Sequence, residues 1–342
     1  MRNCRRKLSI SLIIIFLLNI LLSCNANAID NSNNNKQLMR ICEQVAGEPV
    51  DKNKVKELVA NGLSTEDAKF YLQFDRIVDI LEKEQIVIKL CEGYEEISDR
   101  DFAENQNYYR KKILEGDEGA LIKALKTLNN LFLGQEYAEK LINTYSNKDT
   151  YEVVYPDGTK IIYTSKLKDL NEKRNEEIND LDSQCYINLN IDEYKETLMD
   201  DGIAYYDKGI GAREGEWSFQ SGVSYSKVYL YTEFILGEDN KSYITYARGG
   251  QSSYGVVNIA NSTGATISRQ QSEGKYNLPA EARNEVIFNV TGSFGGNFLA
   301  LSLSVNPGAN WTQYVVFRIF EPEEIDEGNY GAYYTWHAAA FK

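Results

Sequence analysis

Hydrophobic and polar positions divide the chain into an apolar leader, a section with helical spacing and a section with strand-like alternation. The leader runs from Leu8 to Leu22, carries no charge, and follows the basic residues Arg5, Arg6 and Lys7. An apolar run of about 15 residues is shorter than the roughly 20 that a transmembrane helix needs. A basic start followed by a short apolar run is typical of a signal peptide. We therefore expect residues 1–23 to direct export and then to be removed.

Apolar residues recur at helical spacing between residues 37 and 200, with capping residues in front of several of these stretches. Ser64, Ser98 and Asp117 each stand where a side chain can accept hydrogen bonds from the first backbone N–H groups of a helix. Within this section the predicted helices start at these caps or cover residues 53–61, 134–145 and 166–182. The pattern predicts a mainly helical domain over 37–200.

A β-hairpin interrupts this helical section at residues 151–164. Two runs of β-forming residues flank Pro156, Asp157 and Gly158, and glycine readily adopts the left-handed conformation that closes such a turn. An isolated hairpin is only marginally stable in water. We therefore expect this hairpin to pack on the helices or on the second domain.

From residue 203 to residue 342 the chain alternates apolar and polar residues with the period of a β-strand. Turn-forming sequences such as RGGQ, NSTG, GSFGG and NPGAN separate the runs. The predicted strands are 216–220, 227–236, 242–247, 254–260, 265–269, 285–291, 297–305, 312–320 and 332–341. This pattern predicts an antiparallel β-sandwich resembling a jelly roll, and a barrel fits the same pattern almost as well. Together with the helical domain it predicts an α+β fold.

Within the run 227–236, alternation assigns side chains to the two faces of a strand. Val228, Leu230 and Phe234 are expected on the inner face. Tyr229, Tyr231 and Glu233 are expected on the outer face. The second section is also rich in tyrosine and holds all three tryptophans, and aromatic residues of this kind are useful for contacting sugars or proteins.

Two cleavage sites stand at the end of the leader. Leu21, Leu22, Ser23 and Cys24 form a lipobox, in which lipid is attached to the cysteine thiol and Cys24 becomes the first mature residue. The alternative is cleavage after Ala28 by ordinary signal peptidase. The polar stretch up to residue 36 contains too few apolar groups to fold, so residues 24–36 are expected to form a lipidated flexible tether.

Charge and cysteine content exclude several classes of protein. The formal charge of −13 opposes binding to nucleic acid, which requires clustered basic residues. Cys42, Cys91 and Cys185 form an odd set in the mature chain, so at most one internal disulfide can form. With His337 as the one histidine, a zinc site lacks ligands. We expect no metal and no cofactor.

Candidate catalytic groups do not assemble into a recognisable motif. A nucleophilic triad would depend on His337, and no G-x-S-x-G sequence is present. Glu214, Glu216 and Glu233 lie near Trp217 and Tyr231 in sequence and permit a glycosidase pair without indicating one. The stretch 209–215 lacks the lysine of a phosphate loop, and the acidic stretch 321–327 lacks the spacing of a calcium loop. No catalytic residue is predicted.

The leader ending at Cys24, the NSNNNK tether and the stretch ELVANGLSTEDA at 57–68 resemble spirochaetal outer-surface lipoproteins of the relapsing-fever type. The resemblance covers about half of the chain. It implies a protein held by lipid on the surface of the outer membrane and in contact with host molecules. The tyrosine-rich β section departs from the mostly helical pattern of that group.

These observations predict a lipid-anchored cell-surface protein whose β-sandwich binds a host or environmental protein or glycan. The membrane is the expected partner through Cys24, while the ligand-binding residues and the oligomeric state are unknown. Two alternatives stay open. One is an enzyme that acts on glycans, and the other is a membrane-inserting or pore-forming protein, suggested by the Ser- and Thr-rich alternation at 242–269.

Overall fold

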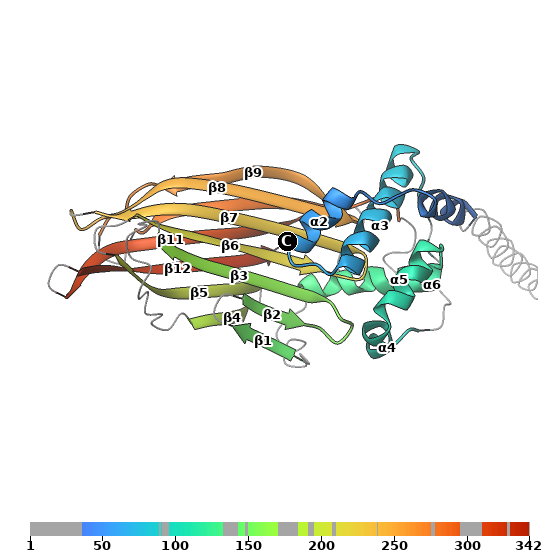
Figure 1. Cartoon of the computed structure of the whole chain (residues 1–342), viewed down its shortest axis with the longest axis horizontal. Helices are drawn as coiled ribbons and strands as arrows, with labels where there is room; N and C mark the ends of the chain where they lie inside the picture. Colours follow the sequence, from blue (N-terminus) through green and yellow to red (C-terminus); the bar gives the residue numbers. More distant parts are fainter. Residues whose placement is uncertain are drawn as a thin grey trace, which may run out of the picture.

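The structure, a computed structural model, places a group of helices at one end of two long β-sheets (Figure 1). It describes residues 36–88, 90, 96–132, 143–147, 150–169, 184–190, 195–206, 210–237, 239–274, 278–294, 310–326 and 329–341. The leader with both cleavage sites, Cys91 and the predicted strand 297–305 lie outside these residues.

The three predicted helix caps are confirmed. The Ser64 hydroxyl accepts a hydrogen bond from the Asp67 N–H at 3.0 Å, and the Ser98 hydroxyl accepts from the Asp101 N–H at 3.1 Å. The Asp117 carboxylate accepts from the Ala120 N–H at 2.9 Å. Residues 36–46 are also helical. The further helices are α2 (Lys52–Ala60), α3 (Thr65–Lys83), α4 (Asp99–Glu104), α5 (Gln106–Leu114), α6 (Glu118–Lys126) and the 3₁₀ helix η1 (Thr127–Phe132).

Twelve strands are described, and they form two six-stranded antiparallel sheets. The first sheet has the order β1-β2-β3-β6-β7-β8, and the second sheet has the order β4-β5-β12-β11-β10-β9. Their bounds are β1 Asn143–Asn147, β2 Thr150–Val154, β3 Lys160–Asp169, β4 Gln184–Asn190, β5 Lys195–Tyr206, β6 Ile210–Gln220, β7 Ser224–Leu236, β8 Ser242–Gly255, β9 Val257–Arg269, β10 Ala280–Val290, β11 Asn310–Asp326 and β12 Asn329–Phe341. The predicted α+β fold with an antiparallel sandwich is confirmed.

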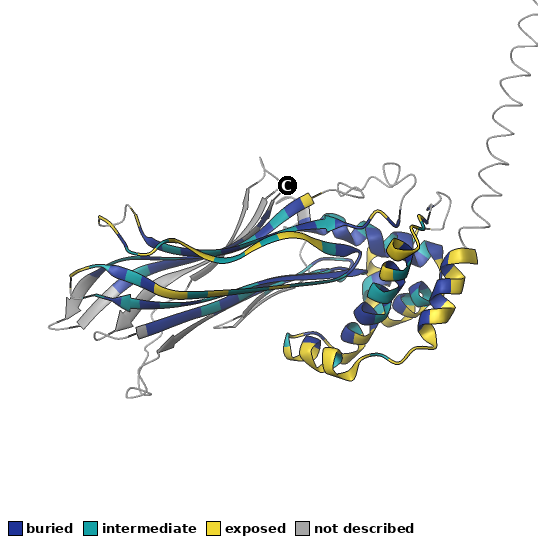
Figure 2. Ribbon diagram, turned by 90° about the horizontal axis from the view of Figure 1, so that it is seen from above, coloured by how far each residue is buried: buried dark blue, intermediate teal, exposed yellow. Residues whose placement is uncertain are grey.

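The sandwich core forms where the inner faces of the two sheets meet. On β7, Val228, Leu230 and Phe234 are fully buried, as the alternation predicts. The Phe234 ring lies 5.5 Å from the ring of Phe317 on β11, measured between centroids. In Figure 2 buried residues recur along the strands. Burial of such large side chains supplies the main stabilising free energy of a sandwich.

The sheets begin earlier in the chain than the sequence analysis places them. The predicted helix 134–145 is wrong over 143–145, which belong to β1, and the predicted helix 166–182 is wrong over 166–169, which belong to β3. The remaining residues of both predicted helices lie outside the described part of the chain. The hairpin 151–164 is confirmed and joins the first sheet, because β3 pairs with β6. Strands β1 to β5 thus lie largely inside the range 37–200 assigned to the helical domain.

Two predicted turns are also wrong. RGGQ at 248–251 lies inside β8, and NSTG at 261–264 lies inside β9. At RGGQ the reason is a close approach between the sheets, since a Cβ atom on Gly249 would lie 2.7 Å from Nδ2 of Asn284 on β10. The glycine there makes room for a neighbouring side chain, and the chain does not reverse direction. Residues 321–326 of the acidic stretch form the end of β11, paired with β12.

The helices and the sheets share one hydrophobic core. Tyr71 on α3 donates its hydroxyl hydrogen to the Ser221 carbonyl at 2.5 Å, and the Gly222 N–H donates to the Thr127 hydroxyl at 2.8 Å. The turn between β6 and β7 is therefore held by α3 and by η1, which follows α6. None of the helices in the described ranges is both long enough and apolar enough to cross a membrane.

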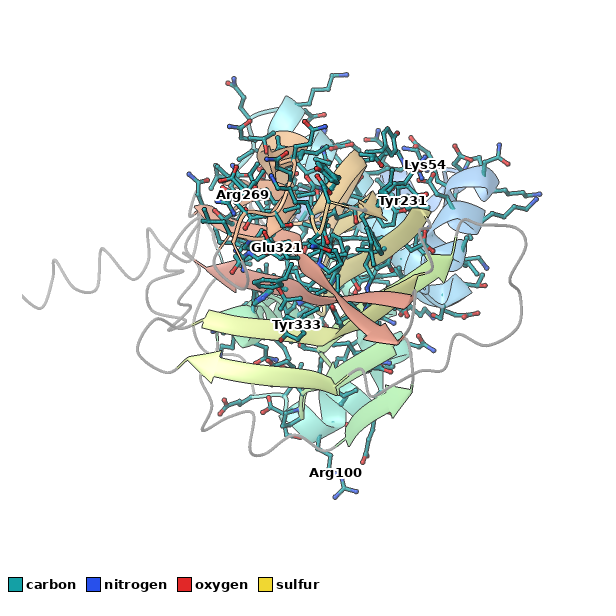
Figure 3. All side chains as sticks on the ribbon, turned by 90° about the vertical axis from the view of Figure 1, so that its left-hand side faces the viewer. Lys54, Arg100, Tyr231, Arg269, Glu321 and Tyr333 are labelled. Carbon is teal, nitrogen blue, oxygen red and sulfur yellow. The ribbon has the colours of Figure 1, made fainter. Side chains whose placement is uncertain are left out.

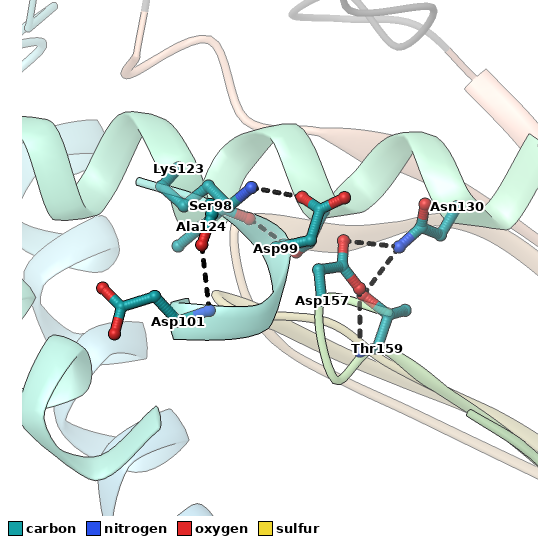
Figure 4. A network of polar contacts seen from close by, with 9 residues as sticks. Ser98, Asp99, Asp101, Lys123, Ala124, Asn130, Asp157 and Thr159 are labelled. Carbon is teal, nitrogen blue, oxygen red and sulfur yellow. Dashed lines mark hydrogen bonds and ion pairs between the residues drawn. The ribbon is translucent and has the colours of Figure 1, made fainter. Parts of the chain in front are cut away.

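A second link joins the helices to the hairpin turn between β2 and β3 (Figure 4). The side-chain amide of Asn130 donates hydrogen bonds to the Asp157 carboxylate at 2.7 Å and to the Thr159 hydroxyl at 3.0 Å. Asp157 also accepts from the Thr159 N–H at 3.0 Å. The hairpin is therefore fixed at its turn as well as along its strands.

Candidate functional site: an open tyrosine face on the first sheet

The helices cover only part of the outer face of the first sheet. At the start of β7, Tyr225 is 2% exposed, and its ring lies 6.2 Å from the ring of Tyr71 on α3 and 6.4 Å from the ring of Tyr254 on β8. Further along the same side of β7, Tyr229, Tyr231 and Glu233 are only half-buried. The outer face is thus closed at the helical end and open beyond it.

An ion pair marks the border between the covered and open parts. Lys227 on β7 pairs with Glu216 on β6, and its Nζ also donates to the Asn61 side-chain oxygen at 3.1 Å. Asn61 ends α2, so this contact joins the helical group to the sheet. Both charges of the pair are largely shielded from water, and each has a partner, as buried charges require.

Beyond the border lies a group of polar aromatic and charged residues that we call the tyrosine face. It comprises Glu214 on β6, Tyr229, Tyr231 and Glu233 on β7, and Tyr246, Arg248 and Gly250 on β8. Strand pairing places Tyr231 directly between Glu214 and Arg248, and Tyr229 opposite Gly250. Directly paired residues point to the same side of a sheet, so these side chains share one surface.

Contacts within the tyrosine face hold the rings in place. The Tyr231 hydroxyl donates to the Glu233 carboxylate at 3.0 Å, and the Tyr231 and Tyr246 rings meet edge to face at 6.2 Å. The Arg248 guanidinium lies 5.6 Å from the centre of the Tyr231 ring. The Tyr229 hydroxyl lies 3.5 Å from a carboxylate oxygen of Glu214.

The electrostatic setting keeps the Tyr231 hydroxyl protonated at neutral pH. Burial, together with the hydrogen bond to Glu233, raises the pKa of Tyr231 to about 12. The Tyr229 hydroxyl raises the pKa of the exposed Arg248 guanidinium. The surface therefore offers neutral hydroxyl groups beside fixed carboxylates and one permanent cation.

One glycine shapes this surface. A Cβ atom on Gly250 would lie 3.7 Å from Cδ1 of Tyr229, so the ring lies beside a position of β8 that carries no side chain.

Figure 3 looks along the strands from the end opposite the helices and labels Tyr231 on β7 and Tyr333 on β12, which belong to different sheets. The tyrosine face belongs to the first sheet alone.

The structure separates the candidate residues that the sequence placed together. Glu214, Glu233 and Tyr231 share the open face, whereas Glu216 is engaged by Lys227. Trp217 lies on the opposite side of β6 and is fully buried. The expectation that tryptophans are exposed for binding is wrong, because the other two are buried as well; they are Trp311 and Trp336.

Other candidate residues lie away from this surface. His337 is half-buried on β12, in the second sheet. Cys42 has a free, buried thiol, and burial raises its pKa to about 12. Residues 211–215 of the glycine-rich stretch belong to β6, where a Cβ atom on Gly215 would lie 2.3 Å from the Thr164 carbonyl oxygen. Within the described ranges, no three His, Cys, Asp or Glu residues are grouped so that they would hold a metal ion.

Sequence reasoning placed Tyr229, Tyr231 and Glu233 on the outer face of their strand, named no ligand-binding residue and did not single out Tyr246. It missed Arg248 and Gly250. These two residues lie in RGGQ, whose composition is typical of a turn. The signal that would have found them is the length of the alternating pattern on both sides, since β8 has to run beside all of β7. The tyrosine face can offer stacking surfaces, hydrogen-bond acceptors and a donor to a ligand.

No protein-family model, curated protein or solved structure matches this chain.

Proposed function

We propose that this chain is a lipid-anchored cell-surface protein that binds an extracellular protein or glycan through its tyrosine face. The observation that carries the proposal is the group Tyr229, Tyr231 and Tyr246, held on the open part of a sheet whose other end is capped by helices. Tyrosine gives a large contact area and loses little conformational entropy on binding.

Two features of the chain suit this role, one in its fold and one in its sequence. The tyrosines lie on strands, where a rigid backbone fixes their positions, and rigid positioning lowers the entropic cost of binding. Cys24, the predicted lipid-attachment residue, precedes the described residues by a short polar segment. A bacterial lipoprotein carries more than one acyl chain, and each buried CH₂ group contributes about 0.8 kcal/mol to membrane attachment.

The test compares the full-length chain in detergent with a Tyr229→Ala/Tyr231→Ala variant on arrays of extracellular proteins and of glycans. We expect saturable binding that the double variant loses. Tyr108→Ala is the matched control, because Tyr108 is 57% exposed on α5 and is not part of the tyrosine face. A ligand that binds the native chain and the double variant equally well would show that the binding surface lies elsewhere. If no protein or glycan on the arrays bound, the proposal would be contradicted.

No specific observation favours either alternative function, the glycan-acting enzyme or the membrane-inserting protein. The carboxylates of Glu214 and Glu233 lie within hydrogen-bonding reach of tyrosine hydroxyls, as expected for positioning groups, and turnover of a glycan would be needed to establish catalysis. Membrane insertion of β8 would require a continuous apolar face. Its outer side instead carries Arg248 and Ser252, and its inner side carries Gln251 and Ser253. Leakage from liposomes at high protein concentration would revive that alternative.

A further inference from the structure

We propose that the ligand of the tyrosine face is a neutral saccharide chain. This inference rests on the proposed function, because it assigns a chemical class to the ligand of the same surface. Three properties of the surface carry it: an aromatic platform next to a glycine, nearby carboxylate and guanidinium groups, and the lack of well-exposed aliphatic side chains on this face among the described residues.

The platform centres on Tyr229. Gly250, its direct partner on β8, has no side chain, and a Cβ atom there would already lie in contact with the ring at 3.7 Å. The open position beside the ring leaves room for a flat ligand to lie against it. The C–H face of a sugar ring is such a ligand, since its hydrogens carry partial positive charge and the face of an aromatic ring is negative.

The polar groups at the edge of the platform match a polyhydroxy ligand. Glu214 and Glu233 are acceptors beside Tyr229 and Tyr231. Arg248, a donor, lies across Tyr231 from Glu214, with its guanidinium 5.6 Å from the centre of the Tyr231 ring. Each sugar hydroxyl both donates and accepts, so a surface with both kinds of group can engage neighbouring hydroxyls. Hydrogen bonds to charged groups are the stronger kind.

The composition of the surface favours a sugar over a protein. The fully buried centre of a protein interface is rich in apolar side chains. Among the described residues, the large hydrophobic side chains that are well exposed are Met39, Val59, Val87, Tyr108, Tyr246, Ile259, Ile267 and Leu278. Of these only Tyr246 belongs to the tyrosine face, so a protein partner would find no aliphatic centre there.

The charge of the molecule favours a neutral sugar over an acidic one. Glu214 and Glu233 lie within hydrogen-bonding reach of the tyrosine hydroxyls, and the whole chain carries a formal charge of −13. Sulfate or carboxylate groups on a glycan would be repelled by both. A neutral chain of hexose units avoids this repulsion.

The experiment is calorimetric titration of the full-length chain in detergent with neutral hexasaccharides, namely a β-1,4-linked glucose, a β-1,4-linked mannose and an α-1,4-linked glucose chain. A heparin hexasaccharide is the polyanionic comparison. We expect at least one neutral chain to bind and heparin not to bind. Tyr229→Ala and Tyr231→Ala should each weaken binding by about tenfold or more, and Gly250→Val should do the same by filling the space beside Tyr229. Tyr108→Ala should leave the affinity unchanged, and thermal unfolding of each variant checks that it is folded.

The outcomes separate the two proposals. Binding of a neutral chain that Tyr229→Ala and Gly250→Val both weaken by about tenfold or more supports the inference. Tyrosine-dependent binding of heparin, or of an array protein with no sugar bound, overturns the neutral-saccharide inference and leaves the proposed binding surface standing. Saccharide binding that survives all three substitutions overturns the assignment of the site. Failure to bind any sugar or any protein contradicts both proposals.

Discussion

Two glycines, Gly255 at the end of β8 and Gly264 within β9, have the same kind of backbone but different surroundings. Gly255 has φ +83°, and a Cβ atom there would lie 2.0 Å from the Val223 carbonyl oxygen. Gly264 has φ +68°, and a Cβ atom there would meet nothing within 4 Å. The pair separates the cost of a left-handed backbone from the cost of a steric clash.

We expect Gly255→Ala to lower the free energy of unfolding by roughly 3 kcal/mol or more, because conformational strain and a backbone clash act together. Gly264→Ala should cost only about 1 kcal/mol, the strain of a left-handed alanine. Urea unfolding of both variants measures the difference. Equal losses would mean that the connection between β8 and β9 shifts freely and that the Gly255 contact is not a constraint.

Asp75 on α3 contacts the end of β8 at Gly255, and burial of its negative charge destabilises the folded protein. Its carboxylate accepts a hydrogen bond from the Gly255 N–H at 3.0 Å, yet burial raises the pKa of Asp75 to about 6. A raised pKa means that the folded state binds the proton more tightly than the unfolded state does. Protonation of Asp75 therefore stabilises the folded state fully below about pH 4, and this stabilisation is lost as the pH rises through about 6.

Asp75→Asn should remove this pH dependence while keeping an oxygen that can accept from Gly255. We expect the variant to be more stable than the wild type at pH 7.5, by at most about 3 kcal/mol, and the two to converge near pH 4. Thermal unfolding across this range is the measurement, with Glu66→Gln on the exposed first turn of α3 as the control. A lower melting temperature for Asp75→Asn at pH 7.5 would show that the charged hydrogen bond outweighs the burial of the charge.

At the scale of elements, local signals predicted helix starts and strand faces well. Ser64 and Ser98 cap helices because a capping side chain needs only the backbone three residues ahead of it. The alternation at 227–236 placed Tyr229 and Tyr231 outward because one strand is enough to define two faces.

Signals that depend on distant residues were missed. Gly249 is required by Asn284 on the other sheet, and nothing near Gly249 in sequence shows this. Residues 166–169 were assigned to a helix because the partners that make them a strand lie far along the chain on β6, whereas β1 pairs with the neighbouring β2. Arg248 joined the candidate site for the same reason, through its pairing with Tyr231.

The link between η1 and the β2–β3 turn is an element-scale constraint that can be broken with one substitution. Asn130 is buried and donates to both Asp157 and Thr159, and burial raises the pKa of Asp157. Asn130→Ala would leave the buried carboxylate with one donor fewer. We expect the free energy of unfolding to fall by about 1 to 3 kcal/mol.

Asn53→Ala is the matched control for that substitution. Asn53 is exposed on α2, and alanine there should change the stability by less than about 1 kcal/mol. Urea unfolding again measures both variants. If Asn130→Ala proved no more destabilising than Asn53→Ala, the Asn130 contacts would not be what holds the hairpin.

At the scale of the whole molecule, the capped sandwich leaves one polar aromatic surface open, and the proposed anchor decides where that surface is displayed. Cys24→Ser removes the thiol to which lipid would be attached, whereas Cys4→Ser changes a cysteine that the predicted cleavage discards. We expect the native chain and the Cys4→Ser variant to incorporate labelled palmitate and to partition into detergent, and Cys24→Ser to lose the label. The reason is that thioether formation requires sulfur at this one position. An unlabelled native chain that begins at residue 29 would instead place the tyrosine face on a secreted protein, free to carry its ligand away from the cell.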